Sequence, residues 1–338
     1  MTSAKRLGER KIIEAIWKQL DKPPRLPVPF GDDVSAVEYK DGELAVLKTD
    51  MLVGRTDVPT QMSYWQAARK AVVMNVSDFA AKGVQPLALL VSLGIPPNFE
   101  RAEIEQIGKG LNMGARKYNV HVLGGDTNEA DDLIINITLF GLSKKKKLIL
   151  RSGAQPGDIV ATTGLFGLTL PGLALLKWRE TGPPEFRDKF IDAVLMPSAR
   201  LREGLALAKT NAISAAIDSS DGLAWSLHEI SRASNVGFII DNPPIAPETF
   251  KFAKTRNLDP FELGFYGGEE YELIVTINPR HYKKAERAVE KQGGKLHKIG
   301  KATAKDELLA QRKGKLVKLK KRGYEHFKHG GRKVDSIL

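Results

Sequence analysis

The chain has 338 residues, of which 42% are hydrophobic and 27% are charged, and its formal net charge is +12. This length suggests two domains, and the composition is ordinary for a globular protein with a sizeable core. The absence of cysteine excludes disulfides, thiolate metal sites, iron–sulfur clusters and a cysteine nucleophile. No apolar run of membrane-spanning length and no apolar N-terminal signal segment are seen, which predicts a cytoplasmic protein.

The first half of the chain is expected to alternate helices and strands. Its helices are predicted from apolar residues at helical spacing, and Ser63 and Gly83 have the residue types that begin and end a helix. In chain order we expect a helix at 9–20, a turn at 31–33, a strand at 43–49, helices at 63–83 and 100–118 on either side of a strand at 87–93, and strands at 120–123 and 133–142.

Four consecutive lysines at 144–147 interrupt the pattern, and we place a domain boundary there, with domains at 1–145 and 146–338. The second half again alternates elements, which favours an α/β or α+β fold in both domains. We expect strands at 159–163, 213–217 and 271–277, and helices at 166–180, 186–193, 199–209 and 223–233.

Acidic residues recur beside glycine or other small residues where strands or helices are expected to end. Each such corner alone is typical of an ordinary turn, but six in one chain favour a site that binds several metal ions and phosphate. Carboxylates brought together need cations, and Mg²⁺ takes oxygen ligands and bridges to phosphates. No P-loop motif is present. The corners are Gly31-Asp32-Asp33, Thr49-Asp50, Ser77-Asp78, Gly124-Gly125-Asp126-Thr127, Asp218-Ser219-Ser220-Asp221-Gly222 and Gly267-Gly268-Glu269-Glu270.

Positive charge is concentrated between residues 280 and 333. A basic segment can bind nucleic acid through phosphate contacts, but this one has few aromatic residues and its lysines alternate with apolar residues. We therefore favour a solvated surface over a nucleic-acid-binding tail.

Eight segments together resemble the thiamine-monophosphate kinase family of the aminoimidazole-ribonucleotide-synthetase-like superfamily. They run in the family's order from residue 31 to 327 and form a specific combination, although each alone would be weak. The segments are GDDVSAV (31–37), KTDMLVGRTDVP (48–59), AARKAVVMNVSDFAAKGVQP (67–86), LGGDTN (123–128), RSGAQPGDIVATTGLFG (151–167), AIDSSDGL (216–223), GGEEYEL (267–273) and RGYEHF (322–327).

The resemblance implies a two-domain subunit and a homodimer in which the N-terminal sheets of two chains pair into a barrel. The implied reaction is direct in-line transfer of the γ-phosphoryl group of ATP to thiamine monophosphate, assisted by several Mg²⁺ ions. It implies metal ligation by Asp33, Thr49, Asp50, Asp78, Asp126, Asp218 and Asp221. It implies ATP contacts at Gly125, Arg151 and Ser220, and acceptor contacts at Glu269 and Tyr324.

Three residues depart from the family pattern and suggest an archaeal-type variant. Lys48 stands where many bacterial members have a small hydroxyl residue near a metal, and Asp57 stands where they carry a substrate-contacting His. Glu270 replaces the usual Asp. We expect Asp57 to belong to the acceptor pocket, and a charged Lys48 cannot be a metal ligand.

Two other hypotheses stay open at this point. The chain could be another ATP-dependent superfamily enzyme, such as an aminoimidazole-ribonucleotide synthetase, which would release inorganic phosphate. It could instead be a nucleic-acid-binding protein that uses the basic segment.

Overall fold

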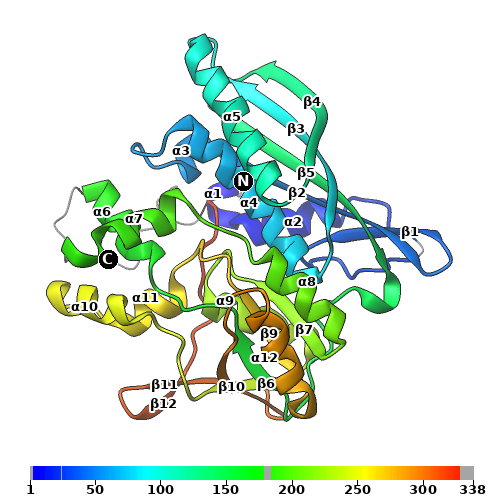
Figure 1. Ribbon diagram of the computed structural model, residues 1–338, viewed down its shortest axis with the longest axis vertical. Helices are drawn as coiled ribbons and strands as arrows, with labels where there is room; N and C mark the ends of the chain where they lie inside the picture. The colour runs from blue at the N-terminus through cyan, green and yellow to red at the C-terminus, as the bar shows by residue number, and fades with distance from the viewer. Residues whose placement is uncertain (1–2, 24, 179–183, 328–338) are drawn as a thin grey trace.

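The structure is a computed structural model that describes residues 3–23, 25–178 and 184–327. It is a two-domain α+β fold built on two mixed β-sheets, which occupy the upper and lower halves of Figure 1. Within the described residues, every helix is too short or too polar to cross a membrane.

The first sheet has five strands in the order β1-β2-β5-β3-β4. Strands β3 and β4 run parallel, and the other neighbours are antiparallel. The strands are β1 (Ser35–Lys40), β2 (Glu43–Val53), β3 (Pro86–Ile95), β4 (His121–Glu129) and β5 (Ile134–Lys144).

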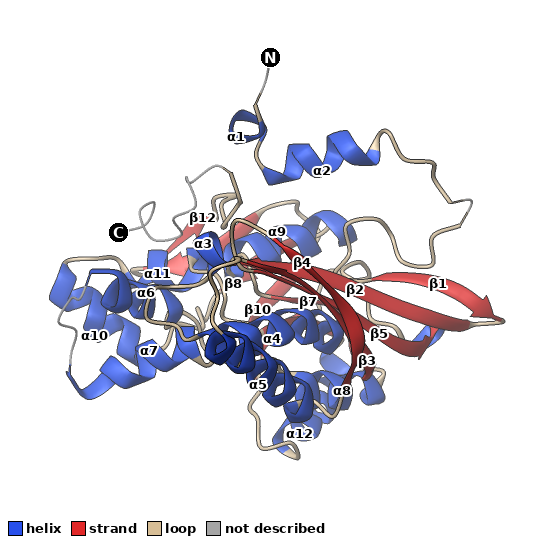
Figure 2. Cartoon of the chain, turned by 90° about the horizontal axis from the view of Figure 1, so that it is seen from above, coloured by secondary structure: helices blue, strands red, loops and turns tan. Residues whose placement is uncertain are grey.

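Helices α4 (Tyr64–Lys82) and α5 (Arg101–Lys117) cover one face of this sheet, as Figure 2 shows. The predicted boundaries of α4 are confirmed. Ser63 and Gln66 form a capping box at its start, and Gly83 closes it at a φ of 66°, where a side chain would be strained.

The second sheet has seven strands in the order β12-β11-β8-β10-β6-β9-β7, in which only β11 and β8 are parallel neighbours. Helix α9 (Leu223–Ser234) and helix α11 (Pro260–Tyr266) pack on one face. Helix α8 (Leu201–Thr210) and helix α12 (Tyr282–Glu290) pack on the other. The strands are β6 (Ile159–Thr162), β7 (Ile213–Asp218), β8 (Gly237–Ile240), β9 (Leu273–Ile277), β10 (His297–Thr303), β11 (Leu308–Arg312) and β12 (Lys315–Lys318).

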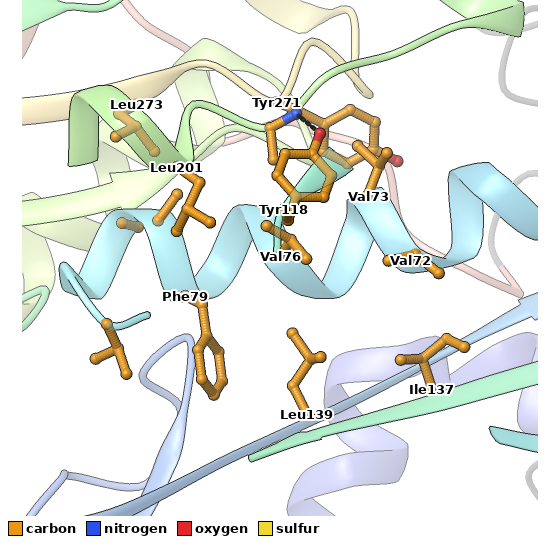
Figure 3. Packing of buried hydrophobic residues seen from close by; sticks show 14 of the residues in the cluster. Val72, Val73, Val76, Phe79, Tyr118, Ile137, Leu139, Leu201, Tyr271 and Leu273 are labelled. Atoms are coloured by element: carbon orange, nitrogen blue, oxygen red, sulfur yellow. Dashed lines mark hydrogen bonds between the residues drawn. The ribbon is translucent and has the colours of Figure 1, made fainter. Parts of the chain in front are cut away.

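Helix α4 lies between the two sheets. In Figure 3 its buried side chains meet Ile137 and Leu139 of the first sheet on one side, and Leu201 and Leu273 of the second half on the other. One hydrophobic core therefore extends across both halves, and almost every residue of α4 from Ala67 to Lys82 is buried. Polar side chains on this helix can reach loops of either domain.

The remaining helices are peripheral. Helix α2 contacts the C-terminal segment, where the backbone N–H of His326 donates to Glu9 and Arg10 pairs with Glu325. These helices are α1 (Ala4–Leu7), α2 (Glu9–Trp17), α3 (Gly54–Asp57), α6 (Thr169–Trp178), α7 (Arg187–Leu195) and α10 (Pro247–Arg256), with 3₁₀ turns at Lys145–Lys147, Pro184–Phe186 and Pro279–His281.

Three of the six predicted corners are not corners. Asp50 lies in the middle of β2, Ser77 and Asp78 lie inside α4, and Gly124-Gly125-Asp126 lies within β4. Glycine and aspartate are disfavoured in strands, but β4 gains its backbone hydrogen bonds by pairing with β3. The basic segment, as far as residue 327, forms α12 and the strands β10, β11 and β12 of the second sheet.

Candidate active site

Helix α4 carries a set of polar side chains that a helix buried on several sides does not need for packing. Asn75, Ser77 and Lys82 are fully buried, and Asp78 is nearly so. Because α4 lies between the sheets, these groups face segments from both halves of the chain. A buried polar group is costly unless it is paired, so each partner is informative.

Three buried carboxylates meet beside α4. Asp33 comes from the loop before β1, Asp78 from α4 and Asp218 from the last position of β7. Each offers a carboxylate oxygen, and these oxygens all lie within 4.8 Å of one another. Ser77 donates a hydrogen bond of 2.7 Å to Asp218 and so ties the end of β7 to the helix.

Two of these carboxylates are electrostatically strained. Burial raises the pKa of Asp78 well above its usual range, and the charges of Asp218 and Asp50 add to the effect while Lys48 opposes it. Burial and the neighbouring Asp33 raise the pKa of Asp218 to about 6. The group thus holds negative charge that the protein does not fully compensate. Hard oxygen ligands with excess negative charge fit Mg²⁺, so the residues suit the metal that the family resemblance implies.

Asp33 differs from Asp78 and Asp218 because two cationic side chains contact its carboxylate. The Lys82 ammonium lies 2.8 Å from one oxygen of Asp33 and 2.7 Å from Asp32, and the Arg151 guanidinium donates to the other oxygen of Asp33. Burial alone would raise the pKa of Asp33, but Arg151 and Lys82 hold it below its usual value. Arg151 also donates to the carbonyl of Gly31, so it orders the whole turn.

Asp50 lies on the other side of Asp78 and shares a cation with it. The Lys48 ammonium is 3.1 Å from a carboxylate oxygen of Asp50 and 3.1 Å from one of Asp78. Burial would lower the pKa of Lys48, but these two carboxylates raise it well above its usual range, so the lysine is charged. Asn75 receives a 2.8 Å hydrogen bond from the backbone N–H of Asp50 and so fixes this strand against α4.

A second group of predicted residues is joined by backbone hydrogen bonds. The carbonyl of Ser220 accepts from the N–H of Glu269 at 2.7 Å, and the carbonyl of Asp221 accepts from the N–H of Tyr324 at 3.0 Å. Arg10 of α2 lies 3.8 Å from the Asp221 carboxylate. The structure therefore brings together Ser220, Asp221, Glu269 and Tyr324, which are separated by up to 104 residues in sequence.

The loop before β9 holds Glu269 in an unusual conformation. Its backbone φ is 66°, which is rare for residues other than glycine, asparagine and aspartate. The buried Lys70 ammonium lies 2.7 Å from the Glu269 carboxylate and also donates to the carbonyl of Asp57. Lys70 thus links two residues that we expect in the acceptor pocket.

Asp57 itself is bound within its own turn. Its carboxylate accepts hydrogen bonds from the N–H of Val53 and the hydroxyl of Thr56, and it is largely buried. Glu270, the third departure from the family pattern, accepts from the N–H groups of Gly167, Leu168 and Thr169 at the start of α6. Burial raises the pKa of Glu270 to about 7, although these hydrogen bonds oppose the shift.

Thr49 and Asp126 lie on the opposite face of the first sheet. Adjacent residues of a strand point to opposite faces, so Thr49 points away from Asp50, and its hydroxyl contacts Asn136 and Thr138. Asp126 pairs with Ser92, in the same row as Asn136 and on the same open face.

Gly125 is needed for close approach of β4 to β3. A Cβ there would come within 1.7 Å of the Val91 carbonyl oxygen, so no other residue fits. This packing role is independent of any phosphate contact.

Sequence reasoning missed Asn75, Ser77 and Lys82 as site residues, and also Lys70. A signal was present, because Asn75, Asp78 and Lys82 are spaced three and four residues apart and so share one face of the helix. Such a polar stripe within a helix capped at both ends indicates a buried network.

Comparisons with known proteins show the family to which the chain belongs. The domain family described as AIR synthase related protein matches its N-terminal domain to residues 31–143 and its C-terminal domain to residues 155–312. The thiamine-monophosphate kinase of Nitrosopumilus maritimus is 36% identical over 96% of this chain and 99% of its own length. That of Pyrococcus horikoshii is 37% identical over 96% and 98%.

A solved structure, AaThiL complexed with AMPPCP and TMP, superposes with a TM-score of 0.83 at 26% identity and covers 96% of this chain and 99% of that one. The two matched domain ranges include Asp33 and Asp78 in the first domain and Asp218 in the second. The chain therefore belongs to the thiamine-monophosphate kinase family, within the AIR synthase related proteins.

Proposed function

We infer that this chain is a kinase that uses ATP to phosphorylate thiamine monophosphate and releases thiamine diphosphate and ADP. The observation that carries this function is the likeness, over almost the entire chain, to thiamine-monophosphate kinases and to a structure that holds AMPPCP and TMP. Both substrates are anionic at their phosphates. Such a reaction needs charge neutralisation more than acid–base catalysis.

We propose direct in-line transfer. An oxygen of the thiamine monophosphate phosphate forms a bond to the γ-phosphorus of ATP as the bond to the β–γ bridging oxygen breaks, and ADP carries that electron pair away. The attacking oxygen is already deprotonated near neutral pH, because the second pKa of a phosphate monoester is about 6. No general base is required, so the enzyme's work is to position two anions and offset their repulsion.

The carboxylate group beside α4 is the proposed metal centre. Mg²⁺ bound there would supply the positive charge that offsets the repulsion between the phosphates. Asp33, Asp78 and Asp218 support this role by their mutual distances and by the raised pKa values of Asp78 and Asp218. The resemblance also implies metal ligation by Asp50 and Asp221, and by Thr49 and Asp126, which we assign to a separate ion site on the opposite face of the first sheet.

The two substrates are proposed to bind on either side of this centre. Arg151, which contacts Asp33, and Ser220 are assigned to ATP together with Gly125. Asp57, Glu269 and Tyr324 are assigned to thiamine monophosphate. The support for the second set is that the segments of Glu269 and Tyr324 are hydrogen-bonded to the same loop, which also carries Asp221.

We also propose a homodimer formed through the open face of the first sheet. Six large apolar side chains on that face are 37–56% exposed, which is unusual for one side of a sheet in a monomer. Thr49 and Asp126 share that face and would lie at the interface. The six residues are Val37, Leu47, Met51, Leu90, Phe140 and Leu142.

The domain boundary is proposed near residue 145. The first sheet ends with β5 at Lys144, and the first strand of the second sheet begins at Ile159. This gives domains at 1–145 and 146–338, which share the core around α4.

A direct assay tests the function. The chain is incubated with ATP, Mg²⁺ and thiamine monophosphate, and the products are identified by mass. We expect thiamine diphosphate and ADP in equal amounts. Release of inorganic phosphate without thiamine diphosphate would instead indicate a synthetase-type reaction.

A further inference from the structure

Lys48 places a permanent positive charge inside the proposed metal centre. It lies in the middle of β2, two residues before Asp50, so both side chains point to the face that α4 covers. Its side chain is 17% exposed, and its ammonium is 3.1 Å from Asp50 and 3.1 Å from Asp78. A lysine so placed is held by its two carboxylates rather than by solvent.

The other cations near this centre contact different oxygens. Lys82 and Arg151 both contact Asp33. Among the described residues, Lys48 is the cation that bridges Asp50 and Asp78. It therefore occupies the space where a divalent ion would have to bind to be shared by those two carboxylates.

The ammonium and a divalent ion exclude each other at that position. Mg²⁺ requires oxygens at about 2.0–2.1 Å, and the Lys48 nitrogen fills the gap between the two oxygens that would supply them. A charged ammonium has three donors and no acceptor, so it cannot itself bind a metal. Displacing it would leave a largely buried positive charge without its partners, which is strongly unfavourable.

We propose that Lys48 is a resident cation that replaces one divalent ion between Asp50 and Asp78. This inference rests on the proposed kinase function and specifies how its metal centre is built. Lys48 is a positioning residue that holds β2 against α4 at the centre and supplies one positive charge that does not depend on free Mg²⁺. Divalent ions then bind through Asp33, Asp78 and Asp218, and Asp50 pairs with Lys48 in place of a metal ion.

The test counts bound ions. The full chain is titrated with Mn²⁺ in the presence of a non-hydrolysable ATP analogue, and bound Mn²⁺ is measured by electron paramagnetic resonance. Lys48→Ser removes the charge and makes room for an ion, whereas Lys48→Arg keeps the charge and is the matched control. We expect Lys48→Ser to bind one more Mn²⁺ per chain than the unchanged chain, and Lys48→Arg to bind the same number.

Thermal melting gives a readout that needs neither substrate nor turnover. In excess chelator, Lys48→Ser should melt below the unchanged chain, because Asp50 and Asp78 lose their shared cation. Saturating Mn²⁺ should raise the melting temperature of Lys48→Ser more than that of the unchanged chain. Lys48→Met fills the space without a charge. In chelator it should also melt below the unchanged chain, but Mn²⁺ should raise its melting temperature less than that of Lys48→Ser.

Equal ion counts for Lys48→Ser and the unchanged chain would overturn the inference. So would a Lys48→Ser chain that stays unfolded in saturating Mn²⁺, since an ion should then take the place of the ammonium. These outcomes are separate from the kinase assay. Normal thiamine diphosphate production with equal counts would reject only the role of Lys48, whereas the expected counts without that product would reject only the proposed function.

Discussion

Strand β2 has two faces that differ in their surroundings. On the face toward α4, Lys48 and Asp50 are tied to Asp78 and Asn75 by ion pairs and hydrogen bonds. On the opposite face, Thr49 is exposed beside Met51 and a surface of unpartnered apolar side chains. Thr49 and Asp50, which are adjacent in one motif, therefore lie in different environments. One face supports a charged centre within a single chain, and the other has the composition of an interface.

The sharpest test of the α4 face is Asp78→Asn. The change removes a charge from the middle of the carboxylate group and from the Lys48 ion pair while it keeps the side-chain shape. We expect kcat to fall by about 1,000-fold, the upper range for loss of one electrostatic stabiliser. Steady-state production of thiamine diphosphate measures the loss.

The exposed Asp131 provides the matched control, because Asp131→Asn changes a carboxylate that does not belong to the group and should leave kcat unchanged. Turnover of Asp78→Asn within a few-fold of the unchanged chain would remove this carboxylate from the chemistry.

The variant Asp126→Asn tests whether the open face of the first sheet takes part in catalysis. The residue lies in β4, on the face away from Asp50, and asparagine preserves its shape. If its carboxylate holds a metal at the interface of two chains, turnover at saturating Mg²⁺ should fall by at least about 100-fold without a change in melting temperature. Native-like turnover would show that the open face only joins chains.

Protonation of Asp218 should make the metal-free protein depend on pH. Burial and Asp33 raise its pKa from 3.8 to about 6, so the native state binds the proton more tightly than the unfolded state does. Its contribution to stability is then full below pH 3.8 and is lost as pH rises through 6. The loss amounts to at most about 3 kcal/mol.

Thermal melts of the unchanged chain and of Asp218→Asn in chelator measure this effect. The two should melt alike near pH 4, and Asp218→Asn should be the more stable at pH 7.5. Adding Mg²⁺ should reduce the difference in melting temperature between the two proteins at pH 7.5. A constant difference between the two proteins from pH 4 to 7.5 would contradict a raised pKa.

A charge on the open face should weaken the dimer. Leu90 of β3 is half exposed on that face, and Leu90→Glu would place a carboxylate among the apolar side chains of the proposed interface. We expect the dissociation constant to rise at least about tenfold, as each unfavourable contact costs 1–2 kcal/mol.

Light scattering across a concentration series detects this shift, from twice the 37.2 kDa chain mass toward the chain mass itself. Phe250 of α10 is equally exposed but lies outside the first sheet, so Phe250→Glu should not change the mass. Equal masses for all three proteins would place the interface elsewhere.

The sequence predicted the elements with strong local signals. Helix α4 was predicted because Ser63 and Gly83 cap it, and β5 because its apolar residues alternate. The strand β4 was predicted only to residue 123, because Gly124, Gly125 and Asp126 favour turns. It continues to Glu129 since β3 supplies hydrogen-bond partners that are distant in sequence.

The sequence predicted which residues form the site better than it predicted how they are arranged in space. The motifs named Asp33, Asp78 and Asp218, which do come together. The opposite facing of Thr49 and Asp50 was missed, because the strand was expected to end at Thr49 whereas β2 continues to Val53. Strand register and the sandwiching of α4 between two sheets decide this, and both arise from contacts between the two halves of the chain. The roles of Lys82 and Lys48 as counter-ions also depend on these contacts, because their carboxylate partners are brought to them only by the fold.

We propose that the carboxylate group beside α4 supports metal-dependent transfer from ATP to thiamine monophosphate. The most direct measurement follows the reaction by phosphorus NMR with the unchanged chain and with Asp218→Asn, each in Mg²⁺ and in excess chelator. We expect thiamine diphosphate and ADP without inorganic phosphate for the unchanged chain in Mg²⁺, and no detectable product in the other three samples. Equal product formation in chelator, or by Asp218→Asn in Mg²⁺, would contradict it.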